Sequence, residues 1–144
     1  MSKRLVLDAN ILIHAVLGTH VSRLIESYAH STDFFTVDEA FEDATKYVPG
    51  VITKFGGDNR AVNAALDKLK RLKRFIQVVP VENLVAYEAE ARERLKRRDE
   101  EDWLYLALAE LLACPIWTED TDFFGTGVAV WTSDKVELFL KRSR

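Results

Sequence analysis

Cysteine is almost absent from this 144-residue sequence, in which Cys114 is the only one. A single cysteine excludes an internal disulfide and a zinc site built from several cysteines, and it fits a reducing compartment such as the cytoplasm. Glycine-rich phosphate loops are absent too. Gly125 and Gly127 lack the later glycine of a dinucleotide motif, and no glycine-rich segment ends in Lys-Ser or Lys-Thr. The sequence therefore argues against a nucleotide-loop enzyme.

Long hydrophobic runs are also missing. The most apolar stretch, residues 103–117, is too short to cross a bilayer and is interrupted by Glu110 and Pro115. The first apolar stretch is cut by Asp8 and lacks a small-residue cleavage pattern. We therefore expect a cytoplasmic protein with neither a membrane span nor a targeting segment.

Neither sign of charge dominates. The 20 Lys and Arg against 23 Asp and Glu give a net charge of −3, which by itself indicates neither a nucleic-acid binder nor an acidic tail. With 48% hydrophobic and 30% charged residues, the composition is that of one globular domain, which we expect to cover residues 1–144. The acids are clustered, and more than half of them lie at Asp8, Asp33, Asp38, Glu39, Glu42, Asp43, Asp99, Glu100, Glu101, Asp102, Glu119, Asp120 and Asp122.

Short β-type runs alternate with helical patterns along the chain. Helices are predicted at residues 10–17, 21–29, 38–47 (closed by Pro49 and Gly50), 59–74, 84–98, 103–112 and 133–141, and strands at residues 4–8, 34–37, 75–79, 115–118 and 128–131. Strands separated by helices favour βαβ units with right-handed crossovers. We therefore predict an α/β fold, a three-layer α/β/α sandwich with a mainly parallel central sheet.

Several acids fall where such a sheet binds ligands, at the carboxyl ends of its strands. Asp8 closes the first strand, Asp120 and Asp122 follow the fourth, and Asp99 and Asp102 share one face at a helix start. Taken singly, each is also a plausible helix cap or solvated charge. Carboxylates gathered within a few ångströms repel one another by roughly 4 kcal/mol per close pair, so the group favours a bound cation. Oxygen-only ligands select Mg²⁺ or Mn²⁺.

Four segments together resemble one family. They are residues 7–12 (LDANIL), the helix around Glu42, residues 98–109 (RDEEDWLYLALA) and residues 116–123 (IWTEDTDF), and they resemble the PIN-domain ribonucleases, including VapC-type toxins. The resemblance implies an endoribonuclease that depends on Mg²⁺ or Mn²⁺. It also implies site residues: Asp8, Glu42, Asp102 and Asp120 as the catalytic, metal-binding acids, Asp99 and Asp122 as further metal-binding acids, and Asn10 and Thr118 as polar neighbours.

The second acid of this set is ambiguous in the sequence. In the family it sits within an apolar helix and is followed by Leu, whereas here Glu39, Glu42 and Asp43 compete on one helical face. We prefer Glu42 for its distance from the strand end, with Glu39 as the next choice.

The chemistry that follows is hydrolysis of an RNA phosphodiester by metal-activated water, and the resemblance implies a 5′-phosphate and a 3′-hydroxyl product. None of the histidines has metal-ligand spacing, so all are assigned to surface or packing roles. An acidic pocket needs a basic rim to bind RNA. Residues 68–74 and 92–98 each carry five Lys or Arg, and we favour Arg97 and Arg98 because they lead directly to Asp99 and Asp102.

Two other functions compete with this one. A catalytically silent PIN-like module would bind RNA or protein without cleaving, and RNA binding unaffected by EDTA would reveal it. A Mg²⁺-dependent phosphotransfer or phosphatase domain would take up phosphate on Asp8, but it leaves Asp99, Asp102 and Glu42 unexplained. For a toxin, the resemblance implies an antitoxin whose C-terminal segment occupies the acidic groove, and commonly a homodimer.

Overall fold

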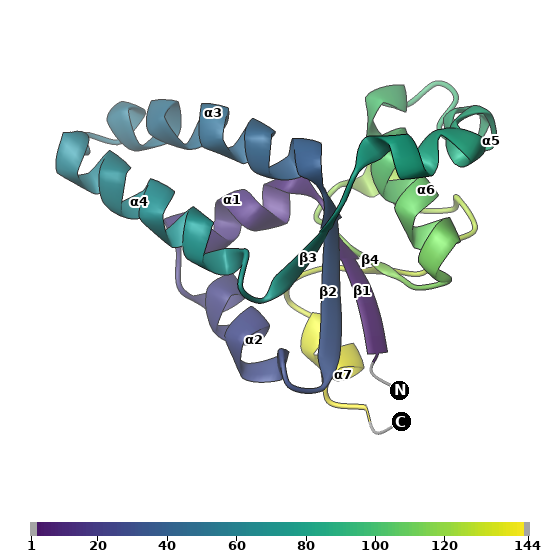
Figure 1. Cartoon of the computed structure of the whole chain (residues 1–144), viewed down its shortest axis with the longest axis horizontal. Helices are drawn as coiled ribbons and strands as arrows, with labels where there is room; N and C mark the ends of the chain where they lie inside the picture. The colour runs from purple at the N-terminus through teal and green to yellow at the C-terminus, as the bar shows by residue number, and fades with distance from the viewer. Residues whose placement is uncertain (1–2, 143–144) are drawn as a thin grey trace.

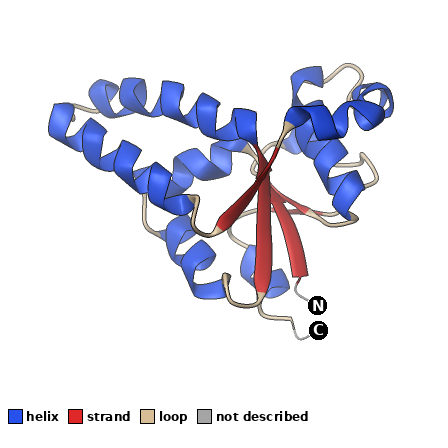
Figure 2. Cartoon of the chain, in the orientation of Figure 1, coloured by secondary structure: helices blue, strands red, loops and turns tan. Residues whose placement is uncertain are grey.

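Five parallel strands form the central sheet, in the order β3-β2-β1-β4-β5. The computed structural model describes residues 3–142, so the outermost residues of the expected 1–144 domain lie outside the described part. Figure 2 shows the strands at the centre with helices on both sides. The predicted α/β class with a parallel sheet is confirmed. The strands are β1 (Lys3–Leu7), β2 (Thr32–Val37), β3 (Ile76–Val79), β4 (Ile116–Trp117) and β5 (Val130–Trp131).

Helices cover both faces of the sheet, which confirms the three layers (Figure 1). One face carries α1 (Ala9–Leu17), α2 (His20–Tyr28), α3 (Asp38–Lys54) and α4 (Asn59–Leu72). On this side α7 (Val136–Leu140) lies beside α2, and the Tyr28 hydroxyl donates to Glu137 at 2.7 Å. The other face carries α5 (Glu88–Arg94) and α6 (Trp103–Leu112), with the 3-10 helix η1 (Val81–Tyr87) leading into α5. Two single-turn 3-10 helices, η2 (Glu100–Asp102) and η3 (Thr121–Phe123), precede α6 and follow β4.

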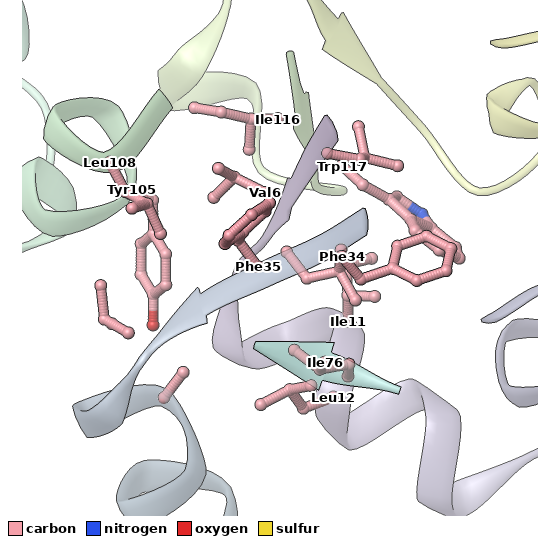
Figure 3. Close-up of a cluster of buried hydrophobic side chains, with 14 of the residues drawn as sticks. Val6, Ile11, Leu12, Phe34, Phe35, Ile76, Tyr105, Leu108, Ile116 and Trp117 are labelled. Atoms are coloured by element: carbon pink, nitrogen blue, oxygen red, sulfur yellow. The ribbon is translucent and has the colours of Figure 1, made fainter. Parts of the chain in front are cut away.

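The central strands are most apolar where they are buried on both faces, as at residues 5–7 of β1 and residues 34–35 of β2. Val6 is in register with Phe35 and Ile116, and in Figure 3 these side chains lie on the side of Tyr105 and Leu108 from α6. On the opposite side, Phe34 and Trp117 pack with ring centroids 6.4 Å apart, near Ile11 and Leu12 of α1. Every residue of α6 from Trp103 to Ala109 is buried, so this helix fixes the position of the acids just before it.

One predicted boundary is wrong, because α3 continues through Pro49 to Lys54 instead of ending at residue 47. Proline lacks the N–H that a helix interior needs, which normally breaks a helix. Here Val48 is fully buried and α3 packs along α1 and α4. Packing of α3 along α1 and α4 therefore compensates for one missing hydrogen bond.

The predicted helix over residues 84–98 also differs. Its first part is 3-10 helix, α5 ends at Arg94, and Arg97 has a left-handed backbone with φ 72°. Within residues 3–142, no helix combines the length and the apolar character needed to cross a membrane.

Candidate active site

Asp8 lies at the carboxyl end of β1 and caps the N-terminus of α1. Its Oδ1 accepts from the backbone N–H of Ile11 at 3.1 Å, and its Oδ2 accepts from the hydroxyl of Thr118. The residue is only 4% exposed. Burial raises the pKa of Asp8 to about 6, although these two hydrogen bonds favour the charged form. The carboxylate is therefore buried, oriented and easily protonated.

Asp102 immediately precedes α6, in the position of a capping residue, yet its side chain makes no capping hydrogen bond. Its Oδ2 is buried, and no group within residues 3–142 donates a hydrogen bond to it. Burial raises the pKa of Asp102 to about 8, and the charge of Asp99 adds to this effect. The neighbouring Asp120 raises it further, because the protonated Asp102 can share a hydrogen bond with that carboxylate. A buried oxygen that accepts no hydrogen bond is costly, so helix capping does not explain this residue.

Hydrogen bonds connect the turn after β4 to the other acids. Thr118 accepts from the backbone N–H of Asp120 at 2.9 Å, and Asp120 accepts from the N–H of Asp122 at 2.8 Å. Oδ2 of Asp122 in turn accepts from the N–H of Asp99 at 3.3 Å. Asp102, Asp120 and Asp122 each offer one carboxylate oxygen, and these oxygens lie within 4.8 Å of one another.

The acids surround one pocket of about 380 Å³ at the carboxyl edge of the sheet. The structure thus brings Asp8, Asp99, Asp102, Asp120 and Asn10 together from three separate parts of the chain. The full lining is Asp8, Ala9, Asn10, Glu39, Asp43, Asp99, Glu101, Asp102, Leu104, Tyr105 and Asp120, which we call the acidic pocket.

Sequence reasoning missed Glu101 and Tyr105 as pocket residues. Tyr105 is only 6% exposed, as fits its place in the most apolar helix, but it also lines the pocket. Burial is the main reason that the pKa of its hydroxyl is raised, and the charge of Asp8 adds to the effect. The available signal was helical spacing, since Tyr105 follows Asp102 by three residues and so shares its face.

Of the four predicted catalytic acids, Glu42 is the one that does not line the acidic pocket. The predicted metal ligand Asp122 does not line it either, although one of its carboxylate oxygens lies within 4.8 Å of those of Asp102 and Asp120. Glu42 lines a different depression of about 380 Å³, together with Asp38, Phe41 and Lys73 among others. The acids of α3 that reach the acidic pocket are Glu39 and Asp43. By position, Glu39 and Asp43 are therefore better placed than Glu42 to serve the acidic pocket.

Helical phase explains this placement. Residues four apart lie nearly above one another, so Glu39 shares its face with Asp43, while Glu42 shares a face with Asp38. Distance from the strand end, the criterion used on the sequence, takes no account of this phase. The pKa of Glu39 is raised, first by burial and then by the charge of Asp43.

The two arginines before the acids differ in their surroundings. Arg98 donates from Nη1 to the backbone oxygens of Asp122 and Phe124, both at 2.6 Å, and so holds the turn that carries Asp120. Arg97 is exposed and has no hydrogen bond or ion pair within residues 3–142. Only Arg97 therefore keeps all its donors for a phosphate.

The donor set of the acidic pocket fits a hard divalent cation. All the candidate ligands are oxygens, several carry negative charge, and one, Oδ2 of Asp102, is buried and accepts no hydrogen bond from residues 3–142. Mg²⁺ and Mn²⁺ take carboxylate oxygens of this kind. A cation would also offset the mutual repulsion that raises the pKa of Asp102.

Residues 6–141 match the sequence family described as the PIN domain. The chain belongs to this family. Among solved structures, the PIN fold of this chain is similar to PAE2754 from Pyrobaculum aerophilum, with a TM-score of 0.73 and 17% identity, covering 97% of this chain and 98% of that one. A search of the curated proteins gives no match to this chain.

Three further solved structures share this fold, and the titles of two of them describe a DNA-bound protein or a toxin-antitoxin complex. VapBC2 from Rickettsia felis, bound to a DNA fragment from its promoter, has a TM-score of 0.67 and 13% identity over 90% of this chain and 98% of that one. FitAcB from Neisseria gonorrhoeae has a TM-score of 0.66 and 20% identity over 90% and 97%. A "Toxin-antitoxin complex from Klebsiella pneumoniae" has a TM-score of 0.56 and 19% identity over 89% and 96%.

Proposed function

We propose that this PIN domain, acting as one nuclease unit over residues 1–144, is an endoribonuclease that depends on Mg²⁺ or Mn²⁺. PIN domains are generally nucleases, which supports the class of reaction. The observation that carries the proposal is the convergence of Asp8, Asp102 and Asp120 on one pocket in which Oδ2 of Asp102 is buried and accepts no hydrogen bond from the described residues.

Each acid of the site has a role that follows from its position. Asp8, Asp102 and Asp120 would hold the ion, with Asp99 and Asp122 supporting them and Glu39 or Asp43 supplying the acid from α3. When bound, the ion lowers the pKa of a water and offsets charge on the phosphate oxygens. Thr118 and the N–H of Ile11 fix both oxygens of Asp8, so its orientation does not depend on substrate. Fixing ligands before the substrate arrives reduces the reorganisation needed for reaction.

We further propose that the nuclease is the toxin of a toxin-antitoxin pair. The similar structure from Klebsiella pneumoniae is a toxin-antitoxin complex by its title, which supports this role. The protein partner would block the acidic pocket with one of its segments, and assembly as a homodimer is compatible with that arrangement.

The test is a cleavage assay on structured RNAs with Mg²⁺, Mn²⁺ or EDTA. We expect metal-dependent cutting that leaves 5′-phosphates and falls at least about 100-fold in Asp8→Asn and in Asp102→Asn. Glu42→Gln is the matched control, because Glu42 is an acid of α3 outside the acidic pocket. Circular dichroism checks that each variant is folded.

Two results would overturn the nuclease assignment. One is activity that survives in both aspartate variants. The other is RNA binding by the wild type that is insensitive to EDTA and gives no cleavage, which would favour the silent module.

A further inference from the structure

A second pocket, of about 500 Å³, adjoins the acidic pocket between α1 and α3. It is lined by Ala9, Asn10, Ile13, Asp43, Lys46 and Tyr47, and we call it the α1–α3 pocket. It shares Ala9, Asn10 and Asp43 with the acidic pocket, so the two hollows meet along one wall. A group that extends from the acidic pocket past Asn10 and Asp43 would therefore enter the α1–α3 pocket.

The lining of this pocket differs in character from that of the acidic pocket. Ala9 and Ile13 give it an apolar floor, and Tyr47 gives it an aromatic wall. Tyr47 is 59% exposed, although large aromatic side chains usually bury most of their surface. Asn10 adds an amide that can both donate and accept. An apolar hollow with a few polar groups is the usual form of a site for a small organic group.

Lys46 supplies the positive charge that the acidic pocket lacks. It is exposed and has no hydrogen bond or ion pair in the part of the chain that is described. It also lines a neighbouring depression together with Lys73, Asp38 and Glu42. Tyr47 and Lys46 therefore offer an aromatic face and a positive charge in a pocket that adjoins the acidic pocket.

We propose that the α1–α3 pocket is a nucleoside subsite of the nuclease, which receives the base next to the scissile phosphate in a single-stranded segment of RNA. Tyr47 stacks on that base, Asn10 contacts its polar edge, and Lys46 contacts the next phosphate. Stacking on aromatic side chains and contacts from basic residues are the main means by which proteins hold single-stranded nucleic acid. This inference rests on the proposed ribonuclease function, and it names the part of the substrate that enters the second pocket.

Photo-crosslinking and steady-state kinetics test the subsite together. Single-stranded RNA containing 5-iodouridine is irradiated with the full-length protein, and the crosslinked peptide is identified by mass spectrometry. We expect a crosslink at Tyr47. In kinetics, Tyr47→Ala should raise KM about 5- to 100-fold with kcat nearly unchanged, while Tyr47→Phe stays close to the wild type.

Two controls separate the subsite from general effects. Phe55→Ala removes an exposed aromatic residue that caps α3 outside the pocket, and it should leave KM unchanged. Lys46→Ala should lower RNA affinity and reduce the salt dependence by about one phosphate contact, whereas Lys54→Ala, in the last turn of the same helix, should do neither.

The outcomes distinguish this inference from the function on which it rests. RNA that is cleaved normally by Tyr47→Ala, with no crosslink at Tyr47, overturns the subsite and leaves the nuclease standing. Loss of binding to a protein partner in Tyr47→Ala, with KM for RNA unchanged, overturns it in favour of a protein-docking surface. RNA that is neither bound nor cleaved by the wild type overturns the nuclease and the subsite together.

Discussion

The hydroxyl of Thr118 donates to Oδ2 of Asp8 across two neighbouring strands, although the two residues are 110 positions apart. Both side chains are buried, and the same threonine oxygen accepts from the backbone N–H of Asp120 at 2.9 Å. Thr118 therefore fixes one acid through its proton and positions a second acid through its oxygen. This one side chain joins the β1 and β4 parts of the acidic pocket.

Replacing Thr118 tests this link. Thr118→Val leaves Oδ2 of Asp8 and the N–H of Asp120 without their partners, so we expect a loss of about 1–3 kcal/mol in the free energy of unfolding. Because this hydrogen bond lowers the pKa of Asp8, the variant should also bind Mn²⁺ more weakly at neutral pH. Urea denaturation and calorimetric titration measure the two effects. Thr118→Ser, which keeps the hydroxyl, should retain most of both properties, and a valine variant as stable as the wild type would refute the link.

The acids of α3 provide a second prediction. Glu39→Gln and Asp43→Asn should each weaken Mn²⁺ binding or RNA cleavage, because both side chains line the acidic pocket. Glu42→Gln should change neither, because Glu42 lies on another face of the helix. The three variants are compared under identical conditions by titration and by initial rates. If Glu42→Gln alone abolished binding, the placement of this helix in the site would be wrong.

The arginines before η2 give a third prediction. Arg98→Ala removes two hydrogen bonds to the turn that carries Asp120 and Asp122, so it should lower Mn²⁺ affinity. Arg97→Ala should leave Mn²⁺ affinity unchanged and weaken only RNA binding, since Arg97 has no partner within residues 3–142. RNA binding is followed by fluorescence anisotropy. Equal effects of the two variants on Mn²⁺ binding would contradict the distinct roles.

The raised pKa of Asp102, about 8 against an ordinary value of 3.8, predicts a pH-dependent stability. Between these values the folded chain binds more protons at this site than the unfolded chain does, so the free energy of unfolding falls as the pH rises. Asp102→Asn removes this penalty. Without divalent ions, the variant should therefore gain stability relative to the wild type as the pH goes from 5 to 8.

Urea denaturation at several pH values measures this change, with Glu42→Gln as a control that keeps the wild-type slope. A stability difference between Asp102→Asn and the wild type that stays constant over this range would mean that Asp102 is not held protonated by the fold.

The fold was predictable because its signals are local. The strands are apolar runs that alternate with helical patterns, and the parallel arrangement follows from that alternation. The predicted end of α3 was wrong because tertiary packing there outweighs the local preference of proline. α3 continues through Pro49 because Val48 is buried against neighbouring helices, a contact that the sequence pattern does not reveal.

The candidate site was predictable in part. Placing Asp8 and Asp120 at one sheet edge needs only the strand order, but selecting the α3 acid needs the phase of that helix about its axis. The hydrogen bond from Thr118 to Asp8 depends on the register of β1 against β4, in which Leu7 lies opposite Trp117. Register between distant strands is a tertiary property, and the sequence offered no equivalent signal for it.

A metal-dependent nuclease of this kind requires that the acidic pocket bind a divalent ion through Asp102. Calorimetric titration of Mn²⁺ into the wild type, Asp102→Asn and Glu42→Gln at pH 7.5 decides this. We predict binding by the wild type and by Glu42→Gln, with uptake of the ion accompanied by proton release, and at least about tenfold weaker binding by Asp102→Asn. Equal Mn²⁺ affinity in the wild type and Asp102→Asn would contradict the account.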